Sequence, residues 1–180
     1  MQKFADIPQS KIFAGIEWLS DRIGYADKDV KGDTYPMTWA DDDEIHTSAG
    51  DPLWGESQSG MDVEKFVGGP ENYVIHKTNH MNEYIGWGGS GPKPSGMICV
   101  DGLLYLAFQN FKGTQPSPFS ILSQHGSDAY ILFADRAFPY WRPAYQHIKE
   151  PMFSGHFFGG PAFVHFGKAR RAIRTARVCR

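Results

Sequence analysis

Two aspartates flank a predicted β-hairpin in the first third of the chain. Asp33 precedes the run 35–40, and Asp51 follows the run 44–49. Both runs are short and β-prone, and the acidic cluster 41–43 between them is typical of a turn. In an antiparallel hairpin the start of the first strand and the end of the second lie at the same end. We therefore expect Asp33 and Asp51 to share one site, with the triple-aspartate turn at the opposite end.

Two carboxyl groups in one cleft are what hydrolysis of a glycosidic bond requires. One group must be protonated to assist the leaving oxygen, and the other must be ionised to activate water or attack the sugar. A separation of about 5–5.5 Å implies retention of configuration and about 6.5–9.5 Å implies inversion, and the spacing does not choose between them. The alternative is that Asp33 and Asp51 cap turns by accepting bonds from backbone amides, and spacing alone favours that alternative.

Three tryptophans and one lysine are candidate sugar-binding residues. Trp39, Trp54 and Trp87 flank acidic or glycine-rich joins, where an indole face can stack on a sugar ring. Trp87 stands between two glycines and is the better candidate, whereas Trp39 lies mid-strand and is also interpretable as a core residue. Lys93 stands between two prolines on a stiff loop, placed to contact a substrate hydroxyl or carboxylate. A solvated surface lysine is the alternative there.

Other reaction classes find no support in the residue patterns. His76 and His80 are four residues apart, but the segment between them is a weak helix former, and no zinc-type spacing of histidines or cysteines occurs. Cys99 and Cys179 are interpreted as free thiols. Nucleophile-elbow, P-loop and dinucleotide-binding patterns are also missing. The sequence therefore predicts no metal and no cofactor.

The length and composition are typical of one globular domain. The 180 residues are 41% hydrophobic and 21% charged with a net charge of −2, which argues against disorder and against a polybasic nucleic-acid binder. No apolar run is long enough for a membrane helix, and the first residues lack the pattern of a secretory signal, which leaves the compartment open. We expect a carbohydrate as partner, and neither nucleic acid nor membrane. The 20 glycines, 12 prolines and 14% aromatic residues favour a β-rich protein.

Apolar strand pairs recur along the chain. The clearest hairpin joins 97–100 to 103–108 through Asp101-Gly102, a strong turn signal. Another is predicted between 121–124 and 129–135, and a further unit begins at 161–167. The sequence therefore predicts an all-β protein. Recurring β units with long irregular joins are typical of a β-propeller, although a β-sandwich fits the pattern almost as well.

Three sequence blocks resemble a known family. They are 33–43 with Gly50-Asp51 beyond it, 93–105, and 159–168. Together they resemble a family of largely uncharacterised domains similar to five-bladed β-propeller glycoside hydrolases, which includes endo-D-arabinanases. The resemblance implies a propeller whose site lies where the inner strands meet at the axis, with the family's acidic positions at Asp33 and Asp51. It also implies export, which is frequent among members of the family.

The chain departs from that family in two ways. Family members are longer, so the resemblance implies an incomplete β-propeller of about two to three blades of antiparallel strands. Residues 1–167 are then a partial propeller domain, and the arginine-rich, acid-free segment 168–180 is a basic tail, disordered or non-native. We expect exposed blade faces to promote self-association and the isolated chain to be weakly active or inactive. The alternatives are a non-catalytic carbohydrate-binding module and a fragment without independent function.

Overall fold

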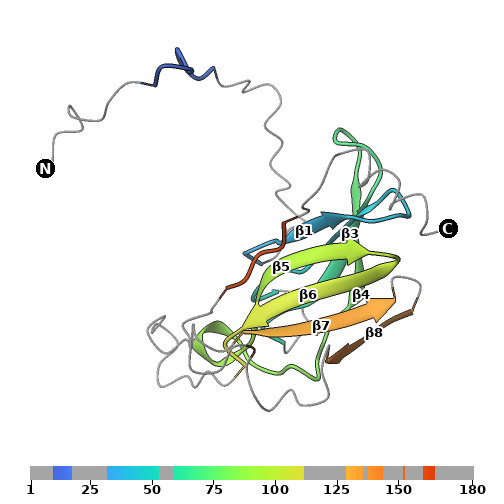
Figure 1. Ribbon diagram of the computed structural model, residues 1–180. Coiled ribbons are helices and arrows are strands. Elements are labelled where there is room, and N and C mark those ends of the chain that lie inside the picture. Colours follow the sequence, from blue (N-terminus) through green and yellow to red (C-terminus); the bar gives the residue numbers. More distant parts are fainter. Residues whose placement is uncertain are drawn as a thin grey trace, which may run out of the picture.

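The protein is all-β in the part of the chain that the structure describes. The computed structural model contains two four-stranded antiparallel sheets and no α-helix among the described residues (Figure 1). None of these residues forms a helix long and apolar enough to cross a membrane. The described residues are 10–17, 32–52, 59–111, 129–135, 138–143, 152 and 160–164.

The first sheet is a simple meander in which each strand pairs with the next one in the sequence. Its strands are β1 (Met37–Trp39), β2 (Ile45–Thr47), β3 (Val63–Val67) and β4 (Val74–Asn79). The β1–β2 pair confirms the first predicted hairpin, with Thr38 opposite His46.

The second sheet repeats the same topology with longer strands. It consists of β5 (Lys93–Val100), β6 (Leu103–Gln109), β7 (Tyr130–Asp135) and β8 (Phe138–Pro143), hydrogen-bonded in that order. The β5–β6 pair confirms the second predicted hairpin.

The two turn residues between β5 and β6 make this hairpin predictable from the sequence. Asp101 and Gly102 adopt φ values of 50° and 77°. Two consecutive left-handed residues form the turn whose twist matches that of the flanking strands, and aspartate followed by glycine adopts it at little cost.

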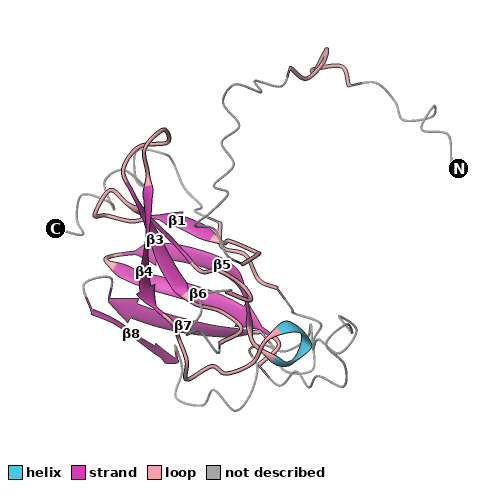
Figure 2. Cartoon of the chain, turned by 180° about the vertical axis from the view of Figure 1, so that it is seen from behind, coloured by secondary structure: helices cyan, strands magenta, loops and turns pink. Residues whose placement is uncertain are grey.

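The hydrophobic core lies between the two sheets, which are stacked face to face (Figure 2). Alternate residues of β6 point into it: Leu104, Leu106 and Phe108 are at most 1% exposed. Val63 of β3 and Met61, which precedes that strand, contribute from the opposite side. Each large apolar side chain buried in this way stabilises the fold by roughly 1.5–3 kcal/mol.

The first strands of the two sheets lie side by side (Figure 1). The Cys99 backbone amide in β5 donates to the Thr38 hydroxyl in β1, at 3.0 Å. On β5, a Cβ atom at Gly96 would lie 2.6 Å from the carbonyl oxygen of Pro161. The segment 160–164 therefore runs against β5 so closely that this position tolerates no side chain.

The predicted hairpin between 121–124 and 129–135 is described only in its second strand. The strand β7 forms at Tyr130–Asp135, but its two neighbours are β6 and β8. Residues 121–124 lie outside the described residues, so this pairing stays a prediction. The strand β8 was not predicted, because its two prolines and an arginine break the expected apolar alternation.

Candidate functional site

A backbone bridge joins the two aspartate-bearing segments. The Asp33 amide donates to the Gly50 carbonyl at 2.8 Å, and the Gly50 amide donates to the Asp33 carbonyl at 2.7 Å. Gly50 also pairs with Met61 on its other side. Asp33 and Asp51 therefore lie at the same end of the hairpin, as the antiparallel geometry predicts, and residues 41–43 form the turn at the other end.

The Asp33 side chain lies over the backbone of Gly50. A Cβ atom at Gly50 would meet the Thr34 hydroxyl at 2.4 Å and the Asp33 carboxylate at 2.6 Å, so only glycine fits there. The Thr34 hydroxyl donates to the Asp33 Oδ1 at 3.2 Å, and Asp33 itself is exposed. This carboxylate is thus accessible to a ligand.

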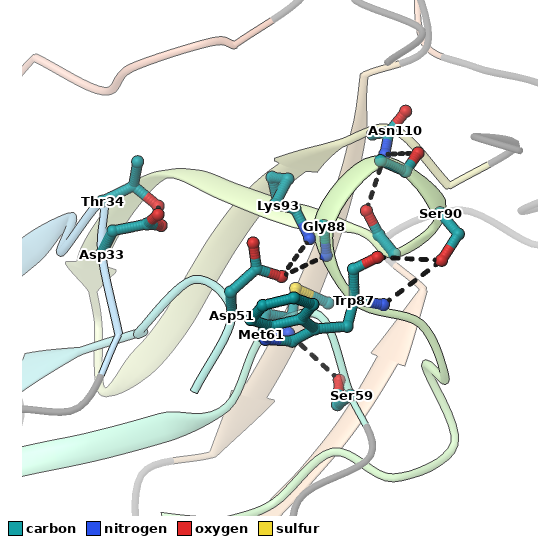
Figure 3. A network of polar contacts seen from close by, with 12 residues as sticks. Asp33, Thr34, Asp51, Ser59, Met61, Trp87, Gly88, Ser90, Lys93 and Asn110 are labelled. Carbon is teal, nitrogen blue, oxygen red and sulfur yellow. Dashed lines mark hydrogen bonds and ion pairs between the residues drawn. The ribbon is translucent and has the colours of Figure 1, made fainter. Parts of the chain in front are cut away.

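Two donors hold the Asp51 carboxylate in place (Figure 3). Its Oδ1 accepts from the Lys93 ammonium at 2.6 Å and from the Gly88 backbone amide at 2.9 Å. The side chains of Asp51 and Lys93 are 18% and 7% exposed, so their charges meet in a largely dry environment. Charge-assisted bonds of this kind are about twice as strong as neutral ones and fix the orientation of the carboxylate.

Lys93 is not the solvated surface lysine of the alternative interpretation. It begins β5, is 6% exposed, and directs its ammonium at Asp51. The charge of Lys93 therefore acts on Asp51. Little of this lysine is exposed for a contact with a ligand carboxylate.

The three predicted tryptophans have different positions. Trp87 is 49% exposed and precedes Gly88, the residue whose amide binds Asp51, so its indole borders the site (Figure 3). Trp39 is 65% exposed and donates from Nε1 to Asp43 at 2.9 Å, at the opposite end of the hairpin. The interpretation of Trp39 as a core residue is therefore wrong, and the hairpin keeps it away from Asp51. Trp54 lies outside the described residues.

Backbone conformations with positive φ occur at this end of the molecule, as they also do at Asp43 and Asp101 elsewhere. Thr34, Asp51 and Asn110 have φ values of 44°, 47° and 64°, and Gly88 has 58°. For a β-branched residue such as threonine, a positive φ is a genuine outlier. Strained residues of this type cost on the order of 1–3 kcal/mol each and cluster at functional sites.

One cluster outside this end has ligand atoms suited to a metal. Asp42, Glu44 and His46 offer ligand atoms within 4.8 Å of one another. However, the Lys65 ammonium already binds Glu44, and the His46 Nε2 lies 3.0 Å from the Asp42 carboxylate. The Lys65 ammonium thus neutralises the carboxylate that a metal ion would bind, and the cluster is a network of ion pairs.

His76 and His80, which are four residues apart in the sequence, do not share a helix face. His76 lies in the strand β4 and His80 follows the end of that strand. Residues four apart come together on a helix and not on a strand.

A second buried acid was missed by sequence reasoning. Asp62 is fully buried, and burial raises its pKa to about 7, with a further contribution from the negative charge of Glu64. The Ala49 backbone amide and the Lys77 charge oppose this increase. Asp62 follows Met61, the residue that pairs with Gly50, so a carboxyl group titrating near neutrality lies one strand away from the candidate site.

Asn110 was missed as well. Its side chain is fully buried and bonds to the loop that carries Trp87, and its sequence signal is weak: a single polar residue after a long apolar strand. The loop itself, 86–91, was identifiable by its glycines.

Asp51, Lys93 and the loop of Trp87 and Gly88 therefore form one connected cluster, and Asp33 lies at the same end of the first hairpin with its carboxylate over Gly50. Comparison of the chain with protein-family models, with curated proteins and with solved structures finds no match.

Proposed function

We propose that this chain is a glycoside-hydrolase-like domain that acts on a polysaccharide through Asp33 and Asp51. The observation that carries the proposal is the bridge between Asp33 and Gly50, which brings two carboxylates to one end of a hairpin. The half-exposed indole of Trp87 at the same end offers a surface for stacking on a sugar ring. Backbone strain at Thr34 and Asp51 also supports a functional role.

We propose different roles for the two carboxyl groups. Asp51 faces the Lys93 ammonium, and this positive charge suits the ionised partner that attacks the sugar or activates water. Asp33 is exposed and lacks a cationic contact among the described residues, and we assign it the remaining role of proton donor to the leaving oxygen. Lys93 then acts by holding the Asp51 carboxylate, and Trp87 by binding the substrate.

We also propose that the two sheets are successive blades of an incomplete β-propeller. Each sheet is a four-stranded meander, and the first strand of one sheet, β1, contacts the first strand of the other, β5. The segment 160–164, where a further unit begins in the sequence, lies against β5 at Gly96. Neighbouring first strands are what two successive propeller blades require.

An apolar row on the first sheet supports the expected self-association. Trp39, Ile45, Phe66 and Ile75 are successive cross-strand neighbours, and Trp39 is 65% exposed. In a propeller such a blade face is covered by the next blade, so we propose that it pairs with another copy of the chain.

Hydrolysis assays with aspartate variants test the proposed function. Release of reducing ends from a panel of polysaccharides that includes D-arabinan should be weak but measurable for the unaltered chain. Asp33→Asn and Asp51→Asn should each reduce it at least a hundredfold, because general acid–base groups contribute about 10²–10⁴-fold. Asp33→Asn should retain turnover of aryl glycosides, whose leaving group needs no proton, and Asp51→Asn should not.

Asp101→Asn is the matched control. Asp101 lies in the exposed β5–β6 turn, where asparagine fits the same left-handed conformation, so the activity should be unchanged. Glycan binding that survives all variants without any turnover would instead indicate a carbohydrate-binding module. A chain that neither cleaves nor binds any glycan would refute the proposal.

A further inference from the structure

Asn110 connects the end of β6 to the loop that carries Trp87. It follows Gln109, whose partner in the sheet is Lys93, and its side chain is fully buried. Its Nδ2 donates to the carbonyl oxygens of Gly89 at 3.0 Å and Gly91 at 2.8 Å (Figure 3). Both bonds from this buried amide nitrogen therefore end on one short loop.

The loop 86–91 has little means of holding its own shape. Its regular part is the three-residue 3₁₀ turn η3 (Gly88–Ser90), too short to be stable by itself. Gly86 and Gly91 lie back to back: a Cβ atom at Gly91 would be 2.4 Å from the Gly86 carbonyl. Ser90 closes the turn by donating from its hydroxyl to the Trp87 carbonyl at 2.9 Å. Because four of the six residues are glycines, an anchor outside the loop must select one conformation.

This loop supplies two elements of the candidate site. The Gly88 amide donates to Asp51 at 2.9 Å, and Trp87 presents an indole that is 49% exposed. Any displacement of the Gly89 and Gly91 carbonyls moves both of these groups together.

We propose that Asn110 is the positioning residue of this loop, which fixes the Trp87 indole and aims the Gly88 amide at Asp51. The ligand-binding part of this inference rests on the proposed function, whereas the effect on the loop does not. Asn110 has a φ of 64°, and asparagine is among the few residues that accept a left-handed backbone while carrying two amide protons. Position 110 thus requires both a left-handed backbone and a side-chain amide donor, and asparagine supplies both.

Asn110→Asp is the sharpest variant. Aspartate accepts the same backbone conformation but replaces the donor nitrogen with an oxygen that faces two carbonyl oxygens. Asn110→Gly keeps the left-handed backbone and removes the amide altogether, which provides a second variant without a buried charge. Asn72→Asp is the control: Asn72 is exposed, and its Oδ1 accepts from the Gly69 amide, a bond that aspartate retains.

Fluorine NMR of chains labelled with 5-fluorotryptophan reads the loop directly, with the Trp87 signal assigned by Trp87→Phe. Asn110→Asp and Asn110→Gly should shift or broaden the Trp87 signal and leave the Trp39 signal at the far end of the hairpin unchanged. Asn72→Asp should change neither. In the unaltered chain, the Asn110 side-chain amide protons should exchange with solvent at least a hundredfold more slowly than those of exposed Asn72, a measurement that needs no variant to fold.

An oligosaccharide that the unaltered chain binds should bind the Asn110 variants at least tenfold more weakly, with the Asn72→Asp affinity unchanged. An unchanged Trp87 signal in folded Asn110 variants would overturn the inference, as would Asn110 side-chain protons that exchange as fast as those of Asn72. If the unaltered chain binds no glycan, the proposed function fails, and the fluorine and exchange measurements still decide the role of Asn110.

Discussion

The geometry of the ion pair between Asp51 and Lys93 allows its contribution to the free energy of unfolding to be predicted. At the observed separation of 2.6 Å, two unit charges attract by about 6 kcal/mol at an effective dielectric constant of about 20. Removing both groups from water offsets much of this attraction, since their side chains are only 18% and 7% exposed. Hydrogen bonds to charged groups retain a net contribution of about 1.5–3 kcal/mol. We therefore expect a coupling energy of about 2 kcal/mol.

A double-mutant cycle with Asp51→Asn and Lys93→Met measures this coupling in urea at neutral pH. Methionine keeps the length and packing of the lysine stem. Asp51→Asn should be the more destabilising single change, because it leaves a buried ammonium without its counter-charge. Adding Lys93→Met to Asp51→Asn should restore part of the lost free energy of unfolding.

The pair Glu44–Lys65 provides the matched control. Its side chains are 22% and 29% exposed, so the equivalent cycle with Glu44→Gln and Lys65→Met should give a smaller and more salt-sensitive coupling. A coupling below about 0.5 kcal/mol for Asp51 and Lys93, the range of exposed pairs, would refute the description of a dry, oriented carboxylate.

Two further predictions concern buried acid and close backbone packing. Because burial raises the pKa of Asp62 to about 7 from 3.8, the folded state binds more protons than the unfolded state between these pH values, and stability falls as pH rises through that window. The difference in free energy of unfolding between Asp62→Asn and the unaltered chain should therefore shift in favour of the variant by about 2–4 kcal/mol from pH 4 to pH 8. Plots of the free energy of unfolding against pH that run parallel for the two proteins would contradict this. Gly91→Ala should destabilise by about 1–3 kcal/mol in a thermal melt, because its Cβ would meet the Gly86 backbone at 2.4 Å. Gly15→Ala, with open space around it, should change stability by less than about 0.5 kcal/mol, and equal effects would count against the proposed packing.

The sequence predicted the features that depend on local rules. The Asp101-Gly102 turn follows from its two left-handed residues, and the meeting of Asp33 with the segment that ends at Asp51 follows from antiparallel pairing. Both are set by residues close together in the chain, so spacing and residue type suffice.

Features set by tertiary contacts were not predictable in this way. Lys93 lies 42 positions from Asp51 in the sequence, and no local pattern indicates that the two charges pair in the interior. The strand β3 carries adjacent Glu64 and Lys65 and lacks an apolar alternation, so it was missed although its first two residues are buried. Trp39 is mid-strand, a position that suits a core residue, but its side chain is 65% exposed.

A ligand titration followed by amide NMR tests most directly whether a glycan binds at this end of the first hairpin. On addition of a glycan that the chain binds, the shifts should gather at the Gly50, Asp51 and Gly88 amides and at the Trp87 indole. These groups come from different segments that the fold unites at one end of the first hairpin. Shifts confined to Trp39 and the 41–43 turn would place binding at the wrong end and contradict the account.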